Sequence, residues 1–318
     1  ASTPVCALTM LDEKPLTLLG AQRMVGAMDI LVMQLLNSLL YASTLFLIAG
    51  GLSLIYGVMR IVNLAHGSLY AVGAYVAAWL VGHMAGGMPA VLLLILLPVG
   101  ALLVGVVGAV IEPTLLRPLY QRPEEYQLLV TFGLLLILED VMRFVWGGTP
   151  LSASALREAF GGVTVFGALY PTYNLVIIVV GLLAAVVLWA FVYRRKFGVL
   201  LRATSQDMRM AAALGVNVKK VYVQAFVLGC MMAGLGGAIV VPKEAAVLGM
   251  GQDVLILAFV VVVIGGLGSL QGALIGALIV GLVRTVGIML FPEIELAMLY
   301  LIAAIVLLVR PTGLFGTP

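Results

Sequence analysis

The chain has 318 residues, of which 63% are hydrophobic and only 10% are charged. About a quarter of the residues of a soluble domain are charged, and a soluble fold of this length lacks the interior volume to bury so many apolar side chains. Composition therefore excludes an ordinary soluble protein, and the small net charge of +3 is less informative than the distribution of the basic residues along the chain.

The first 29 residues are mixed in polarity and include Asp12, Glu13 and Lys14. They show no clear signal-peptide pattern. We expect residues 1–29 to form an N-terminal extension and residues 30–318 to form a membrane domain.

Long apolar segments occupy most of the remaining sequence. A bilayer core is crossed by about 20 apolar residues in a helix. The segments of suitable character are 30–56, 68–82, 90–111, 127–146, 174–193, 221–241, 254–290 and 296–308. Segment 254–290 is too long for one crossing and contains a glycine-rich break at 265–269, so it forms two short helices or a re-entrant pair. The sequence predicts an all-α, polytopic transmembrane bundle with eight or nine spans.

Basic residues are concentrated in the loop 194–220, which contains seven of the 17 lysines and arginines. Such loops remain on the cytoplasmic side of a membrane. Alternation of the spans then places the N-terminus outside and the C-terminus in the cytoplasm. It also places Glu112 at a cytoplasmic helix end, where we expect solvent or a partner subunit around it.

A short helix is predicted within this basic loop. Thr204 followed by Asp207 matches a capping-box pattern, and Gly215 suits the C′ position that ends a helix. Its apolar face would carry Met208, Ala211, Ala212 and Leu214, with Arg209 on another side. So short a helix is marginal alone in water. The segment is either a solvated connector or a docking element for a cytoplasmic subunit.

Small and polar residues suggest where a solute would cross. Transporters place substrate sites at broken helices within the membrane, and glycine interrupts the segments 63–70 and 265–272. Candidate pathway residues are Asn63, His66, Ser68, Ser269 and Gln271, and Arg284 would attract a carboxylate if it faced a cavity. Alternatively, Asn63 and His66 only satisfy backbone groups at the membrane boundary. Glycines at small-xxx-small spacing, such as Gly229 and Gly237, predict close helix packing.

Four motifs resemble one family of transport proteins. They are IVNLAHG at 61–67, the segment from Phe197 to Asn217, IGGLGSLQGA at 264–273 and RPTGLFG at 310–316. In this order they are similar to the branched-chain amino acid permeases of ABC importers, over residues 30–318 and more to the LivH-type than to the LivM-type subunit. Permeases for urea and related small solutes share the pattern. Leu257 and Arg284 differ from the residues that family members often have at these positions. These differences affect the expected substrate more than the expected fold.

The resemblance implies an importer subunit of the bacterial-type inner membrane that carries branched-chain amino acids or a related small polar solute. The loop 194–220 would then hold a coupling helix whose contacts with the ATPase involve Thr204, Asp207, Met208, Arg209, Ala211, Ala212, Leu214 and Gly215. The implied partners are a LivM-type permease, two ATPase subunits and an extracytoplasmic solute-binding protein, and no nucleic acid.

ATP binding is not expected in this chain itself. A P-loop requires a lysine directly after a glycine, and no lysine of this sequence follows one. We therefore expect no enzymatic activity, cofactor or metal in this chain, with ATP and Mg²⁺ held by the partners. The alternative functions are an ion-coupled secondary transporter and a channel. A coupled carrier needs ionisable residues deep in several helices, which are few here, and a channel needs no capped helix in a basic loop.

Overall fold

The computed structural model of the protein describes the backbone of residues 16–84, 88–165 and 167–316, with side chains from residue 28 onward. The fold is an all-α bundle, as the sequence predicts. The first half contains α1 (Leu16–Met59), α2 (His66–Met84), α3 (Ala90–Ile111), the π-helical turn η1 (Glu112–Leu116), the 3₁₀ turn η2 (Arg117–Leu119), α4 (Glu124–Trp146) and α5 (Ser154–Phe160). The second half contains β1 (Gly162–Val165), β2 (Ala168–Pro171), α6 (Thr172–Arg194), α7 (Lys196–Gln206), α8 (Met208–Ala213), α9 (Val218–Val240), α10 (Met250–Gly265), α11 (Leu270–Leu290), η3 (Pro292–Ile294) and α12 (Glu295–Val309).

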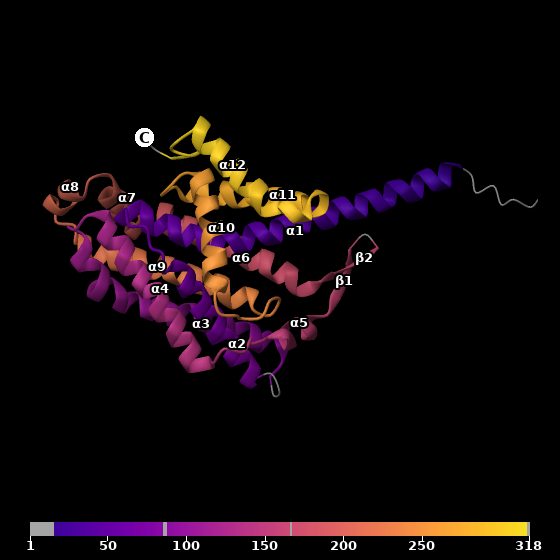
Figure 1. Cartoon of the computed structure of the whole chain (residues 1–318), viewed down its shortest axis with the longest axis horizontal. Coiled ribbons are helices and arrows are strands. Elements are labelled where there is room, and N and C mark those ends of the chain that lie inside the picture. The colour runs from indigo at the N-terminus through magenta and orange to yellow at the C-terminus, as the bar shows by residue number, and fades with distance from the viewer. Residues whose placement is uncertain (1–15, 85–87, 166, 317–318) are drawn as a thin grey trace, which may run out of the picture.

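The two ends of the bundle differ in character (Figure 1). Helices α7 and α8 lie at one end, and the antiparallel hairpin β1–β2 lies at the other. Helix α1 runs the length of the bundle and projects past the hairpin end, so residues 16–29 continue this helix. Residues 1–15 of the expected extension lie outside the described residues.

Six helices in the described part of the chain are long and apolar enough to cross a membrane. They are Met28–Met59, Ala90–Leu119, Thr172–Arg194, Val218–Val240, Leu270–Leu290 and Pro292–Val309. The expected glycine break separates α10 from α11, but α10 has only 16 residues. That length is about 24 Å, less than the roughly 30 Å of a hydrocarbon core. The expected count of eight or nine spans therefore stays a prediction.

Glycines bring the backbones of the central helices into direct contact. Helix α2 packs against α9, α3 and α10. A Cβ atom on Gly237 of α9 would lie 1.9 Å from the carbonyl oxygen of Tyr70 in α2, and one on Gly73 would lie 2.2 Å from that of Gly234. Only glycine permits such an approach, which confirms the packing predicted from the spacing of Gly229 and Gly237.

We predict that Gly237→Ala destabilises the protein by about 1–3 kcal/mol, because overpacking a close contact forces the backbone to shift. The measurement is the unfolding midpoint of the purified chain in mixed detergent. The matched control is Gly133→Ala in α4, where an added Cβ meets no atom within 4 Å. It should leave stability unchanged or raise it by up to about 1 kcal/mol. Equal effects of the two substitutions would contradict the packing argument.

Candidate functional site

Helix α8 begins at a cap that the sequence analysis misplaced. Asp207 is the N-cap, and its carboxylate accepts a hydrogen bond of 2.9 Å from the Met210 amide. Thr204 was expected in that role, but it is buried inside α7, where its hydroxyl donates to the Leu200 carbonyl at 2.8 Å. This bond within α7 satisfies the hydroxyl, so the helix continues to Gln206 before it breaks.

The end of α8 follows the prediction. Gly215 adopts the left-handed conformation with φ of +86°. Its amide donates to the Ala212 carbonyl at 3.0 Å, and the Val216 amide donates to the Ala211 carbonyl at 3.0 Å. These two bonds form a Schellman motif, which satisfies carbonyl groups that a short helix leaves free. Both ends of α8 are therefore fixed by local hydrogen bonds.

The apolar side chains of α8 mostly face away from the protein. Ala211 is buried, whereas Met210 is 58% exposed and Leu214 is 78% exposed. Met208, Arg209, Ala212 and Gly215 are exposed as well. The four apolar residues expected on one face are thus divided, with Ala211 holding the helix to the bundle and the others forming an outward surface. Figure 1 shows this helix at the extremity of the bundle.

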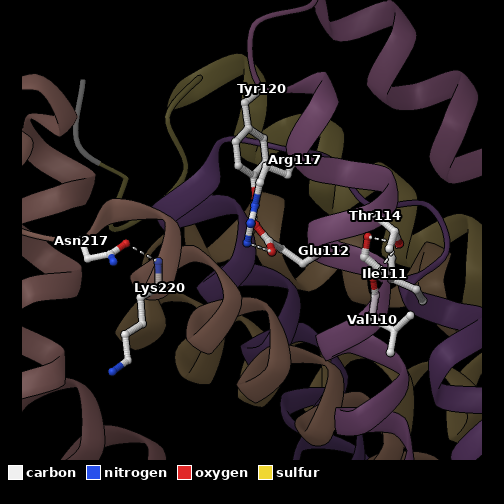
Figure 2. A network of polar contacts seen from close by, with 8 residues as sticks. All are labelled: Val110, Ile111, Glu112, Thr114, Arg117, Tyr120, Asn217 and Lys220. Atoms are coloured by element: carbon white, nitrogen blue, oxygen red, sulfur yellow. Dashed lines mark hydrogen bonds and ion pairs between the residues drawn. The ribbon is translucent and has the colours of Figure 1, made fainter.

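A polar network surrounds the buried Glu112 carboxylate, directly after the end of α3 (Figure 2). We expected solvent or a partner around Glu112, but its side chain is fully buried. Arg117 Nη2 donates to one carboxylate oxygen of Glu112 at 2.8 Å, and the Tyr120 hydroxyl donates to the other. The carboxylate can be buried because an opposite charge and a second donor compensate for its lost hydration.

This network reaches α8 through two aromatic rings. The ring of Tyr120 packs edge-on against that of Tyr222 in α9, with centroids 5.1 Å apart. The Tyr222 hydroxyl lies 3.3 Å from the sulfur of Met208, the first residue of α8, and donates to it. Burial and the bond to Glu112 raise the pKa of Tyr120, so its hydroxyl stays protonated. A continuous set of contacts therefore joins Glu112 to α8.

Three of the candidate pathway residues gather at the start of α2. The Asn63 side-chain oxygen accepts from the Ala65 amide at 3.1 Å, and His66 Nε2 lies 3.1 Å from the Ile48 carbonyl of α1. The Ser68 hydroxyl donates to the Leu135 carbonyl of α4 at 3.4 Å. All three side chains are buried, and the Asn63 amide nitrogen and His66 Nδ1 have no partner.

The other three candidates lie elsewhere. Ser269 caps α11 by accepting from the Gly272 amide at 3.0 Å, and Gln271 is exposed. Arg284 pairs with Glu295 at 3.2 Å and stacks over the ring of Tyr41. Ser269 and Arg284 are separated by roughly 22 Å along one helix. The structure therefore does not assemble the six candidates into one site, and Arg284 already has a carboxylate partner.

Sequence reasoning missed the Glu112 network. The only sequence feature that marks the network is a carboxylate followed by two prolines, Pro113 and Pro118. These prolines disturb the helix and allow a π-helical turn at Glu112–Leu116. Within residues 28–316, apart from the masked positions, no group of three or more His, Cys, Asp or Glu side chains could hold a metal ion.

We predict that Glu112→Gln destabilises the protein by about 1–2 kcal/mol, because Arg117 and Tyr120 would lose a charged acceptor while the partly exposed Arg117 still reaches water. Thermal unfolding of the purified chain in detergent measures the effect. Glu158→Gln, an exposed carboxylate in α5, is the control and should change stability by less than about 0.5 kcal/mol. An unchanged stability of the Glu112 variant would show that the pair contributes nothing.

Comparisons with known proteins find related sequences over most of the chain. The sequence model of the family described as "Branched-chain amino acid transport system / permease component" matches residues 34–309. The chain is 31% identical to the high-affinity branched-chain amino acid transport system permease protein LivH of Escherichia coli K12, over 90% of this chain and 95% of that one. It is 29% identical to BraD, the corresponding permease protein of Pseudomonas aeruginosa, over the same shares of the two chains.

Among solved structures, the chain is similar to a metal-chelate type ABC transporter in an inward-facing conformation, with a TM-score of 0.47 and 19% identity over 87% of this chain and 83% of that one. The family match covers most of the sequence, and the relatives are similar over nearly their full length. This chain belongs to the family of branched-chain amino acid transport system permease components.

Proposed function

We propose that this chain is the membrane-spanning subunit of an ABC importer that moves branched-chain amino acids or a related small polar solute. Energy would come from ATP hydrolysed by partner subunits. The observation that carries this proposal is α8, a short helix in the most basic loop with a fixed cap at each end and exposed apolar side chains. A solvated connector would not need a rigid helix that presents Met210 and Leu214 outward. The names of the relatives supply the solute class.

The proposed assembly contains a LivM-type permease, two ATPase subunits and an extracytoplasmic solute-binding protein. Seven basic residues in the loop 194–220 support a cytoplasmic position for α7 and α8 in the inner membrane. The hairpin β1–β2, at the opposite end, would then face the solute-binding protein. This orientation places the N-terminus outside and the C-terminus in the cytoplasm.

The start of α2 is the proposed part of the solute pathway. Asn63 and His66 each carry one buried nitrogen without a hydrogen-bond partner. A buried unpaired polar atom costs about 1–3 kcal/mol, so its retention where the connection from α1 enters α2 suggests a partner in another state of the transport cycle. A backbone role alone accounts for only one polar atom of each side chain.

We predict that Ala212→Arg and Leu214→Glu abolish the association with ATPase subunits and the uptake of leucine. Both residues are exposed, so the substitutions should leave the thermal stability of the chain unchanged. The measurement is co-purification of the tagged chain from native membranes, with the bound ATPase quantified.

The matched control is Leu169→Glu in strand β2, which is exposed at the opposite end of the bundle. It should retain the ATPase. Normal ATPase recovery with both α8 variants would show that docking occurs elsewhere.

We predict that Asn63→Ser lowers leucine uptake about tenfold or more, while the ATPase still co-purifies. Serine can form the same local turn, with its hydroxyl as acceptor for the Ala65 amide, but it removes the unpartnered amide nitrogen. Uptake into cells and stability in detergent are measured together. The variant could instead be less stable, with uptake reduced only as much as the amount of folded protein. That result would assign Asn63 a purely structural role.

A further inference from the structure

A cavity of 680 Å³ opens at the α7–α8 end of the bundle. Its walls come from the end of α1, the junction of α6 and α7, the turn between α10 and α11, and the segment 311–316 after α12. The cavity is separate from the start of α2 and from the Glu112 network, since none of their residues lines it. Nothing in the proposed transport function accounts for it.

The cavity is positively charged. Arg60 and Arg202 line it, and no aspartate or glutamate does. Arg202 stacks over the ring of Tyr193 and donates to the Val192 carbonyl, which fixes its position at the wall. Neither arginine takes part in an ion pair within the described part of the chain. Two guanidinium groups without counter-ions favour an anionic ligand.

One wall residue carries a polar group with no partner. Ser53 of α1 is fully buried, lines the cavity, and its hydroxyl makes no hydrogen bond. Three other buried hydroxyls within helices, those of Ser38, Thr204 and Thr285, donate to the carbonyl four residues earlier. A buried hydroxyl that forgoes this bond is costly, and a ligand oxygen in the cavity would satisfy it.

The start of α11 adds a third feature. Ser269 and Leu270 line the cavity, and they begin a helix of 21 residues. The first amides of a helix lack intrahelical acceptors and carry the positive end of its dipole. Only the Gly272 amide is satisfied by the Ser269 side chain. Such a helix end favours a phosphate group.

The rest of the wall is mixed, with the polar side chains of Ser205, Gln206 and Thr312 and several apolar ones. The apolar part includes Val192, Val263 and Leu307, of which Leu307 is exposed. A ligand with an anionic head and a hydrocarbon chain matches this division. Basic pockets between helices at the cytoplasmic side of membrane proteins bind anionic lipid head groups.

We propose that this cavity binds a phosphate group, supplied by an anionic phospholipid of the adjacent leaflet. Arg60 and Arg202 would pair with the phosphate, and Ser53 would donate a hydrogen bond to it. The apolar part of the wall would hold the start of an acyl chain. This inference requires only that the chain lies in a membrane, and it does not depend on the proposed solute or on the ATPase partners.

The test is native mass spectrometry of the full-length chain, purified and delipidated in detergent. Three probes separate the parts of the ligand: phosphatidylglycerol, the diacylglycerol with the same acyl chains, and glycerol phosphate. We expect phosphatidylglycerol to bind at least tenfold more tightly than diacylglycerol, and this preference to weaken with added salt.

Two variants and a control assign the binding to this cavity. Arg60→Gln should reduce phosphatidylglycerol affinity about tenfold, as expected for loss of one charge-assisted contact. Ser53→Ala should reduce it severalfold, yet leave the stability of the lipid-free chain unchanged or higher, since it removes an unsatisfied hydroxyl. Arg122→Gln, an exposed arginine at the same end that does not line the cavity, should have no effect.

The pattern of affinities decides whether the cavity is a phospholipid site. Affinity lost with Arg60→Gln and Ser53→Ala but kept with Arg122→Gln supports the phospholipid site. Glycerol phosphate that binds as tightly as phosphatidylglycerol, with the same dependence on Arg60, would keep the phosphate site but assign it to a soluble ligand. Equal binding of diacylglycerol, or equal loss in all three variants, would overturn the proposal.

Discussion

Contact between the backbones of α2 and α9 is the constraint on which the rest of the structure depends. Gly237 lies against the Tyr70 carbonyl and Gly234 against Gly73, so no side chain separates these two helices. In a bilayer, apolar side chains gain little by leaving lipid for protein, and close van der Waals contact supplies much of the association between helices. Helix α2 is thereby fixed at the centre of the bundle.

The same helix α9 connects this centre to α8, the proposed docking helix. It packs on α2 near one end, and near its other end Tyr222 contacts Met208 of α8 and the ring of Tyr120. Because its glycine contacts leave no room for sliding, a displacement of α8 that moved α9 would carry α2 with it. The buried pair of Glu112 and Arg117 ties the end of α3 to this path. In the proposed importer, these contacts would connect partner binding at α8 with the proposed solute pathway near Asn63.

Sequence patterns predicted the features that depend on local chemistry. Apolar segments, the glycine break before α11 and the left-handed Gly215 each follow from properties of a few neighbouring residues. The N-cap of α8 was misplaced because Thr204 and Asp207 both match capping patterns, and only the bond from Thr204 to Leu200 decides between them. The start of α1 at Leu16 was missed because residues 16–29 are less apolar than the span that follows.

Features that depend on tertiary contacts could not be predicted from this sequence. A carboxylate at the end of an apolar segment normally reaches water, and the burial of Glu112 follows from Arg117 and Tyr120 folding back over it. By contrast, the separation of Ser269 and Arg284 could have been predicted, because 15 residues of one helix span roughly 22 Å. Arg284 looked unpaired because its partner, Glu295, belongs to the next helix.

Reconstitution into proteoliposomes tests the central claim most directly. The chain is incorporated with and without its co-purified partner subunits and the solute-binding protein, and uptake of radiolabelled leucine is measured with and without ATP on the cytoplasmic side. An ABC importer subunit should support uptake only when the partners and ATP are both present. Leucine transport by the chain alone, driven by an ion gradient or by the leucine gradient itself, would contradict the account and establish a carrier or a channel instead.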